Sequence, residues 1–147
     1  MASVRARIKG QEIAIVATAG GNVVDSFDAI MNFNEEYQAE IKTQGYLGET
    51  NNRKDDVYNG EKFDMEVHLS TQNFYKFRDL VKARQTRQQP DLVFNISVQF
   101  QFPNGDSPVL TITDIKFGAM PTNVSGRTEY VKVKIDGEAD DYDVLYS

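Results

Sequence analysis

Hydrophobic and polar residues alternate along most of this chain, and this two-residue period restricts the possible folds more than any other feature. The clearest run spans residues 92–102, where every second residue is Leu, Phe or an aliphatic β-branched residue. Such alternation is typical of strands with one buried and one solvated face. Similar patterns predict further strands at about residues 4–8, 13–17, 29–43, 63–69, 108–117 and 131–135. We therefore expect a mainly β protein.

One segment departs from this period. Its apolar residues, Phe74, Phe77, Leu80 and Val81, are spaced as on one face of a helix. Ser70 or Thr71 is a suitable N-cap, and Pro90 ends the helical segment. The sequence thus predicts a single α-helix over about residues 71–87 that flanks the β-structure. Its basic residues are expected to point outward, namely Lys76, Lys82, Arg84 and Arg87.

Turn residues place the connections between these strands. The segment of about residues 46–60, YLGETNNRKDDVYNG, is polar and predicts a long loop between two strands. A long loop inside a compact domain usually has a function. Asn104-Gly105 predicts a hairpin turn, and the alternation slips around Thr113-Asp114, which indicates a bulge.

Length and charge limit the protein class. At 147 residues the chain is expected to form a single domain, 1–147, with its own core. It contains no cysteine, which excludes disulfides and thiolate chemistry. The net charge of −6 argues against a general nucleic-acid-binding protein, and no segment has the length and hydrophobicity of a signal peptide or membrane span.

The residues offer little catalytic chemistry. His68 is the single histidine, and without cysteines a metal site would have to consist of carboxylates. The acidic segment DGEADDYD lacks the twelve-residue pattern of a calcium loop, and no nucleophile elbow is present. We expect no catalytic residue, no metal site and no cofactor, and hence no enzyme.

Charge is distributed unevenly along the chain. Residues 70–89 carry five basic groups against one acidic group, whereas the C-terminal segment is acidic. This asymmetry suggests that copies dock onto each other, although pairing within one chain is equally possible. The acidic candidates for such a contact are Asp140, Asp141 and Asp143.

The order of these segments is more specific than any short motif. A polar strand pair (FDAIMNFNEEYQAEIKTQGYLG and EKFDMEVHLS) encloses the loop ETNNRKDDVYNG. One helix, a hairpin and the closing strand YVKVKIDGEADDYDVL follow. From about residue 8 to 146 this order resembles the tail tube proteins of contractile-tailed phages and phage-like particles. That family shares its fold with the haemolysin-coregulated tube protein of type VI secretion.

The resemblance implies a β-sandwich or barrel-like domain whose copies form six-fold rings. The rings would stack into a tail tube that conducts DNA inside a contractile sheath. It also implies partners (sheath, tape-measure and baseplate or terminator proteins) and a location in the virion tail after assembly in the host cytoplasm. The loop at about 46–60 would reach the adjacent ring through Glu49, Asn51, Asn52, Arg53, Lys54, Asp55 and Asp56.

Polar strand faces are the candidates for the tube lumen. Head-to-tail ring closure removes open strand edges, and large barrels have polar interiors. The candidate lumen residues are Gln38, Glu40, Lys42, Asp64, Glu66 and His68. Carboxylates repel phosphate whereas lysines attract it, so an acidic lumen would let DNA slide without specific binding. The basic helix and the acidic end would contact the sheath or a neighbouring subunit.

Two alternatives remain at this point. A tube-initiator, baseplate or secretion-system tube protein would have the same fold and the same pattern. A small-ligand-binding β-barrel belongs to another class, and it would need an interior pocket. The inward faces of this chain are instead rich in Phe, Ile, Leu and Val, as in a packed core.

Overall fold

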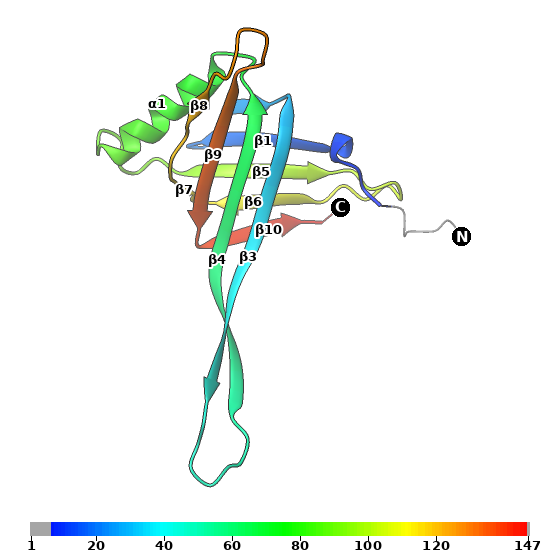
Figure 1. Ribbon diagram of the computed structural model, residues 1–147, viewed down its shortest axis with the longest axis vertical. Helices are drawn as coiled ribbons and strands as arrows, with labels where there is room; N and C mark the ends of the chain where they lie inside the picture. Colours follow the sequence, from blue (N-terminus) through cyan, green and yellow to red (C-terminus); the bar gives the residue numbers. More distant parts are fainter. Residues whose placement is uncertain (1–6, 147) are drawn as a thin grey trace.

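The computed structural model describes residues 7–146 and consists of two antiparallel β-sheets and one α-helix. The sheets lie face to face, and their strands cross at a steep angle (Figure 1). A short 3-10 turn, Gly10–Glu12, precedes the first strand. The strands are β1 (Ile13–Ala19), β2 (Asn22–Phe27), β3 (Ile30–Gln44), β4 (Arg53–His68), β5 (Phe94–Phe100), β6 (Val109–Thr113), β7 (Lys116–Phe117), β8 (Thr122–Asn123), β9 (Lys132–Ala139) and β10 (Asp141–Leu145).

Each sheet combines segments that are distant in the sequence. The first sheet has the order β10-β6-β5-β1-β2, and the second has the order β3-β4-β9-β7, with β8 also pairing with β9. The expected strand at about 4–8 falls largely outside the described residues, and its described part, residues 7–8, lies in no strand. The mainly β fold with one flanking helix is confirmed.

The chain changes sheets at Asp114. This residue has a φ of 49°, between β6 in one sheet and β7 in the other. The slipped alternation around Thr113-Asp114 therefore marks a crossing between sheets, where a bulge was expected. The acidic C-terminal segment also differs from expectation, because β9 continues to Ala139 and β10 then pairs with β6 in the opposite sheet.

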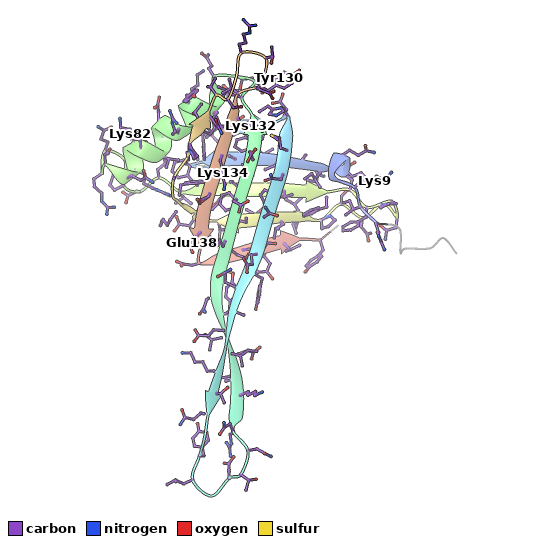
Figure 2. The ribbon with its side chains drawn as sticks, viewed as in Figure 1. Lys9, Lys82, Tyr130, Lys132, Lys134 and Glu138 are labelled. Carbon is purple, nitrogen blue, oxygen red and sulfur yellow. The ribbon has the colours of Figure 1, made fainter. Side chains whose placement is uncertain are left out.

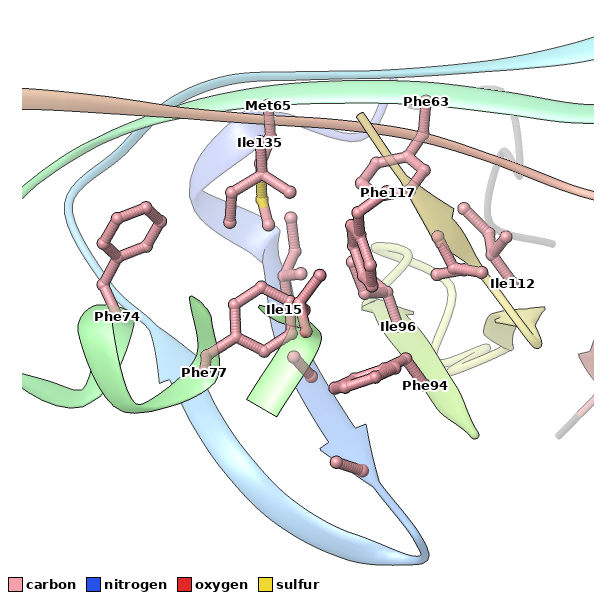
Figure 3. Packing of buried hydrophobic residues seen from close by; sticks show 14 of the residues in the cluster. Ile15, Phe63, Met65, Phe74, Phe77, Phe94, Ile96, Ile112, Phe117 and Ile135 are labelled. Atoms are coloured by element: carbon pink, nitrogen blue, oxygen red, sulfur yellow. The ribbon is translucent and has the colours of Figure 1, made fainter. Parts of the chain in front are cut away.

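The core lies between the two sheets and is filled by side chains (Figure 3). Phe77 of the helix reaches its centre, where its ring makes edge-on contacts with Phe94 and Phe117 at centroid distances of 5.8 and 5.2 Å. Edge-on packing is a favourable geometry for aromatic pairs. The rings occupy the space that a ligand-binding barrel would need, which counts against that alternative.

The helix α1 (Asn73–Gln85) lies within the predicted range of 71–87. The predicted N-cap is wrong, because Gln72 holds that position and makes no capping bond with its side chain. Ser70 instead donates a hydrogen bond to Asp28 at 2.6 Å. Thr71 lies outside the helix, where its hydroxyl accepts a bond from the Asn73 amide at 3.3 Å.

A long two-stranded arm replaces most of the predicted loop at 46–60. Strand β4 begins at Arg53, and its first residues pair with β3 down to Gln44, so only residues 45–52 connect the strands. The arm projects beyond the sandwich (Figure 1), and residues 41–56 are all exposed. The sequence predicted a strand to about residue 43 but a loop from about residue 46, because a strand pair without a core shows no apolar alternation.

A bulge marks the point where the arm leaves the sandwich. Gln38 pairs with Gly60 and Ala39 with Tyr58, which leaves Asn59 as the extra residue. Gly60 has a φ of 104°, and a Cβ there would collide with the carbonyl of Ala139 in β9. Glycine is required at this position for both reasons.

Candidate assembly surfaces

The outward side of the β3-β4-β9 sheet forms a continuous polar surface, here called the outer face. In β4, Phe63, Met65 and Val67 are buried in the core, so the alternate residues point to the other side. Directly paired residues of antiparallel strands point to the same side, and β3 keeps its alternation past the bulge. Six predicted lumen residues therefore share this one face, Gln38, Glu40, Lys42, Asp64, Glu66 and His68.

Strand β9 changes the charge of the outer face. Lys132 lies opposite His68 and Lys134 opposite Glu66, and Figure 2 shows both lysines along this strand. Lys62 of β4 pairs with Glu36 on one side and Glu138 on the other. The face thus mixes carboxylates and lysines, whereas the sequence analysis expected acidic character. The alternation of Lys132 and Lys134 with apolar residues was visible in the sequence, but the strand beside them was not.

His68 has a structural partner on this face. Its ring stacks on Tyr130 with a centroid distance of 5.1 Å. Among residues 7–146, no group of three or more His, Asp or Glu side chains is arranged to hold a metal ion. The helix found in this range is also too short and too polar to span a membrane.

The tip of the arm is an ordered cluster around Arg53. Its guanidinium donates to both carboxylate oxygens of Glu49, at 2.9 and 2.6 Å, and lies 5.0 Å from the centre of the Tyr46 ring. Leu47, which follows Tyr46 in the chain, is fully exposed. The other predicted stacking residues are exposed as well: Asn51 and Asn52 lie in the connection, and Lys54, Asp55 and Asp56 lie in β4.

The predicted basic surface of α1 is smaller than expected. Lys76, Lys82 and Arg87 are exposed, but the prediction for Arg84 is wrong, because only 6% of this residue is exposed. Its guanidinium lies 4.5 Å from the centre of the Phe94 ring. It donates to the carbonyls of Ile115 and Leu92, at 2.6 and 3.3 Å. Arg84 thus satisfies buried carbonyls under the helix and is unavailable for an outer contact.

The acidic candidates at the C-terminal end remain available. Asp140, Asp141 and Asp143 are all exposed. Asp140 lies in the turn between β9 and β10, and the other two lie in β10.

Sequence analysis missed a buried carboxyl at the base of the arm. Glu61 is 2% exposed; its Oε1 accepts a bond from the Tyr58 hydroxyl at 3.3 Å, and its Oε2 has no partner among the described residues. Burial, followed by the neighbouring Glu35, raises the pKa of Glu61 to about 8. Nothing in the sequence distinguished Glu61 from the exposed glutamates.

Tyrosines surround this carboxyl. The Tyr58 ring lies 4.8 Å from that of Tyr37 and 6.5 Å from that of Tyr142. Burial and then Glu61 raise the pKa of Tyr58 to about 12, and the same two causes raise the pKa of Tyr142. At neutral pH Glu61 is therefore mainly protonated, and Tyr58 and Tyr142 keep their protons.

No family model matches the sequence, and the search of curated proteins finds no match either. Solved structures do match over nearly the whole length. A chain of the tube-terminating cap of the anti-feeding prophage has a TM-score of 0.67 at 12% identity, with 100% of this chain and 96% of that one covered. A chain of the 6-fold symmetrised baseplate of the same particle has a TM-score of 0.63 at 10% identity, covering 99% and 97%.

A third match comes from the extended sheath–tube complex of the PVC extracellular contractile injection system. Its TM-score is 0.62 at 10% identity, with 98% of this chain and 95% of that one covered. At sequence identities this low, the structural matches establish a shared fold and no more. The chain therefore has the β fold of contractile-injection-system tube, cap and baseplate proteins, as its order of elements had indicated.

Proposed function

We propose that this chain is a structural subunit of a contractile tail-like particle, in which copies form six-fold rings that stack into a tube. The observation that carries this proposal is the arm. It extends a paired strand hairpin away from the core, and none of its residues from 41 to 56 is buried within the chain. A long exposed arm that packs against no core is typical of a segment that another molecule covers.

The fold and the open strand edges support the same proposal. Strand β3 forms one edge of its sheet and is fifteen residues long. A long open edge is an aggregation risk unless a partner pairs with it. A head-to-tail ring uses such an edge and closes on itself. In this arrangement the outer face lines the lumen, and the arm contacts the adjacent ring.

The mixed charge of the outer face suits passage of a duplex. Lysines attract phosphate and carboxylates repel it. Lys62 lies between Glu36 and Glu138 across the strands, so its charge is balanced locally. DNA therefore passes the lumen without specific binding, and the sheath, tape-measure and baseplate or terminator proteins are the other partners. The site of action is the virion tail, after assembly in the host cytoplasm.

A role in the cap or baseplate is the second candidate, because chains from both assemblies share this fold over nearly the whole length. A tube-body protein should polymerise alone into long tubes, whereas a cap or initiator protein should stop at one or two rings. Negative-stain microscopy of the purified protein separates these outcomes. A strictly monomeric protein at high concentration would refute both candidates.

Truncating the arm tests its function directly. Residues 41–56 are replaced by Asn-Gly, which joins the paired residues Glu40 and Val57 by a turn suited to two-residue hairpins. The variant loses no buried residue and should fold, as circular dichroism and thermal melting can verify. We expect single rings without tubes. Normal tubes from the folded variant would show that the arm does not mediate stacking.

A charge reversal tests the lumen. Changing Glu40 and Glu66 to lysine adds two cations to the outer face, while Glu129→Lys in an exposed loop serves as the control. Tubes of the double variant should retain duplex DNA at a salt concentration at which wild-type and control tubes release it. If all three kinds of tube retain DNA equally, the outer face does not line the lumen.

A further inference from the structure

A groove between α1 and the edge strand β2 lies at the end of the molecule opposite the arm tip. Strand β2 is the last strand of its sheet, and Figure 1 shows α1 at the top and the tip of the β3–β4 arm at the bottom. Apolar side chains line the groove from three segments, namely Val23, Val24, Leu80 and Leu92. Val23 is 63% exposed, so this apolar wall faces solvent.

The groove also contains a carboxylate without a partner. Asp25 of β2 lines it and is 7% exposed, yet within residues 7–146 its side chain takes part in no hydrogen bond or ion pair. Asp28 lines the same groove, and burial followed by the charge of Asp28 raises the pKa of Asp25. Lys76 of α1 lines the groove too, so two carboxylates, one of them buried, face a single cation there. The remaining negative charge favours a further cationic group.

The arm tip carries the complementary groups. Leu47 is a fully exposed apolar side chain, and Arg53 lies over the ring of Tyr46, the residue before Leu47. Glu49 occupies Nε and Nη2 of Arg53. The guanidinium has five N–H donors, so Nη1 keeps donors that can reach a carboxylate outside the tip. A tip that carries both an exposed apolar residue and a guanidinium matches a groove that has an apolar wall and an excess of carboxylates.

We propose that the α1–β2 groove of one copy receives the arm tip of a second copy, with Leu47 against the apolar wall and Arg53 at Asp25. This contact rests on the proposed function, since it names the surface of the next ring that the arm reaches. Tip and groove lie at opposite ends of each copy, so the contact repeats head to tail along one axis. Each copy then uses its tip once and its groove once.

Paired cysteines test this geometry, because the chain contains no native cysteine. The double variant Leu47→Cys/Val23→Cys is compared with Leu47→Cys/Leu145→Cys and with Leu47→Cys alone. Leu145 is 69% exposed, similar to Val23, but it lies in β10, at the opposite edge of the sheet. A short thiol cross-linker should give a ladder of multimers only with the Val23 pair, since a single cysteine can give at most dimers.

Microscopy of the same samples separates failure of the inference from failure of the proposed function. If microscopy shows rings or tubes but the Val23 pair gives no ladder, the groove assignment is wrong and the proposed function stands. The same holds if only the Leu145 pair gives a ladder. A ladder from the Val23 pair without rings would support the groove contact and count against the ring. A monomeric protein without any ladder would overturn both.

Charge variants test the proposed contact between Arg53 of one copy and Asp25 of the next. Arg53→Gln should raise the concentration needed for stacking about tenfold, because a charge-assisted hydrogen bond is lost. Glu49→Gln removes the ion pair within the tip but keeps the guanidinium, so it should weaken stacking less than Arg53→Gln. Arg127→Gln removes an exposed guanidinium from another loop and is the matched control, which should stack close to the wild-type concentration. An equal loss for Arg53→Gln and Glu49→Gln would show that tip order matters and that the Asp25 contact does not exist.

Discussion

Replacing Glu61 by glutamine should stabilise the protein at alkaline pH and leave it nearly unchanged at acidic pH. The pKa of Glu61 rises from an ordinary value of 4.5 to about 8 in the folded chain. The folded state therefore keeps its proton over a range in which the unfolded state has lost it. By linkage, the contribution of Glu61 to the free energy of unfolding falls as the pH rises from about 4.5 to 8. Below pH 4.5 this contribution is constant.

The size of the effect follows from the two pKa values. Each pH unit between 4.5 and about 8 corresponds to about 1.4 kcal/mol, so ionising Glu61 inside the fold costs on the order of 5 kcal/mol. Single domains have total stabilities of about 5–15 kcal/mol, so this loss is a substantial fraction. A glutamine side chain avoids it, because its oxygen can accept from Tyr58 and its amide can donate to Glu35.

Urea denaturation at pH 5 and pH 8.5, followed by circular dichroism at concentrations that keep the protein monomeric, measures the effect. Wild type should lose several kcal/mol of unfolding free energy between the two pH values, and Glu61→Gln should lose much less. Glu36→Gln is the matched control, since Glu36 lies on the same sheet but on the exposed outer face. A stabilisation by Glu61→Gln of equal size at both pH values would refute a protonated, buried Glu61.

Three further substitutions test the packing, each measured as the free energy of unfolding in urea. Arg84→Met should destabilise by about 2–3 kcal/mol, because one buried and one partly buried carbonyl lose their donor, whereas Arg87→Met on the exposed surface should change little. Gly60→Ala should destabilise by about 1–3 kcal/mol, because φ is 104° there and the new Cβ would collide with the β9 backbone. Its control is Gly10→Ala, because no atom lies near a Cβ at that position. Phe77→Ala should cost about 3–5 kcal/mol, as it empties the centre of the core. A loss under 1 kcal/mol for Phe77→Ala, or equal effects of a variant and its control, would contradict the packing described.

Features that depend on neighbouring residues in the chain were predictable. The two-residue period placed the strands around Phe94, Ile96 and Val98, and all three are buried. The switch to helical spacing at Phe74 placed α1 to within two residues at each end. Local sterics and the amphipathic pattern decide these features, and both can be read from consecutive residues. The polar face of β3 and β4 could be recognised in the same way.

Features that depend on contacts between distant segments could not be predicted. Arg84 and Arg87 look alike in the sequence, but only Arg84 lies beneath the helix where the Ile115 carbonyl needs a donor. Glu61 became a protonated group because burial, followed by Glu35 of the adjacent strand β3, raises its pKa. The alternating pattern marks which residues share a side of a strand. Burial, pKa and the charge of a face depend on what packs against that side, and only the tertiary structure brings those partners together.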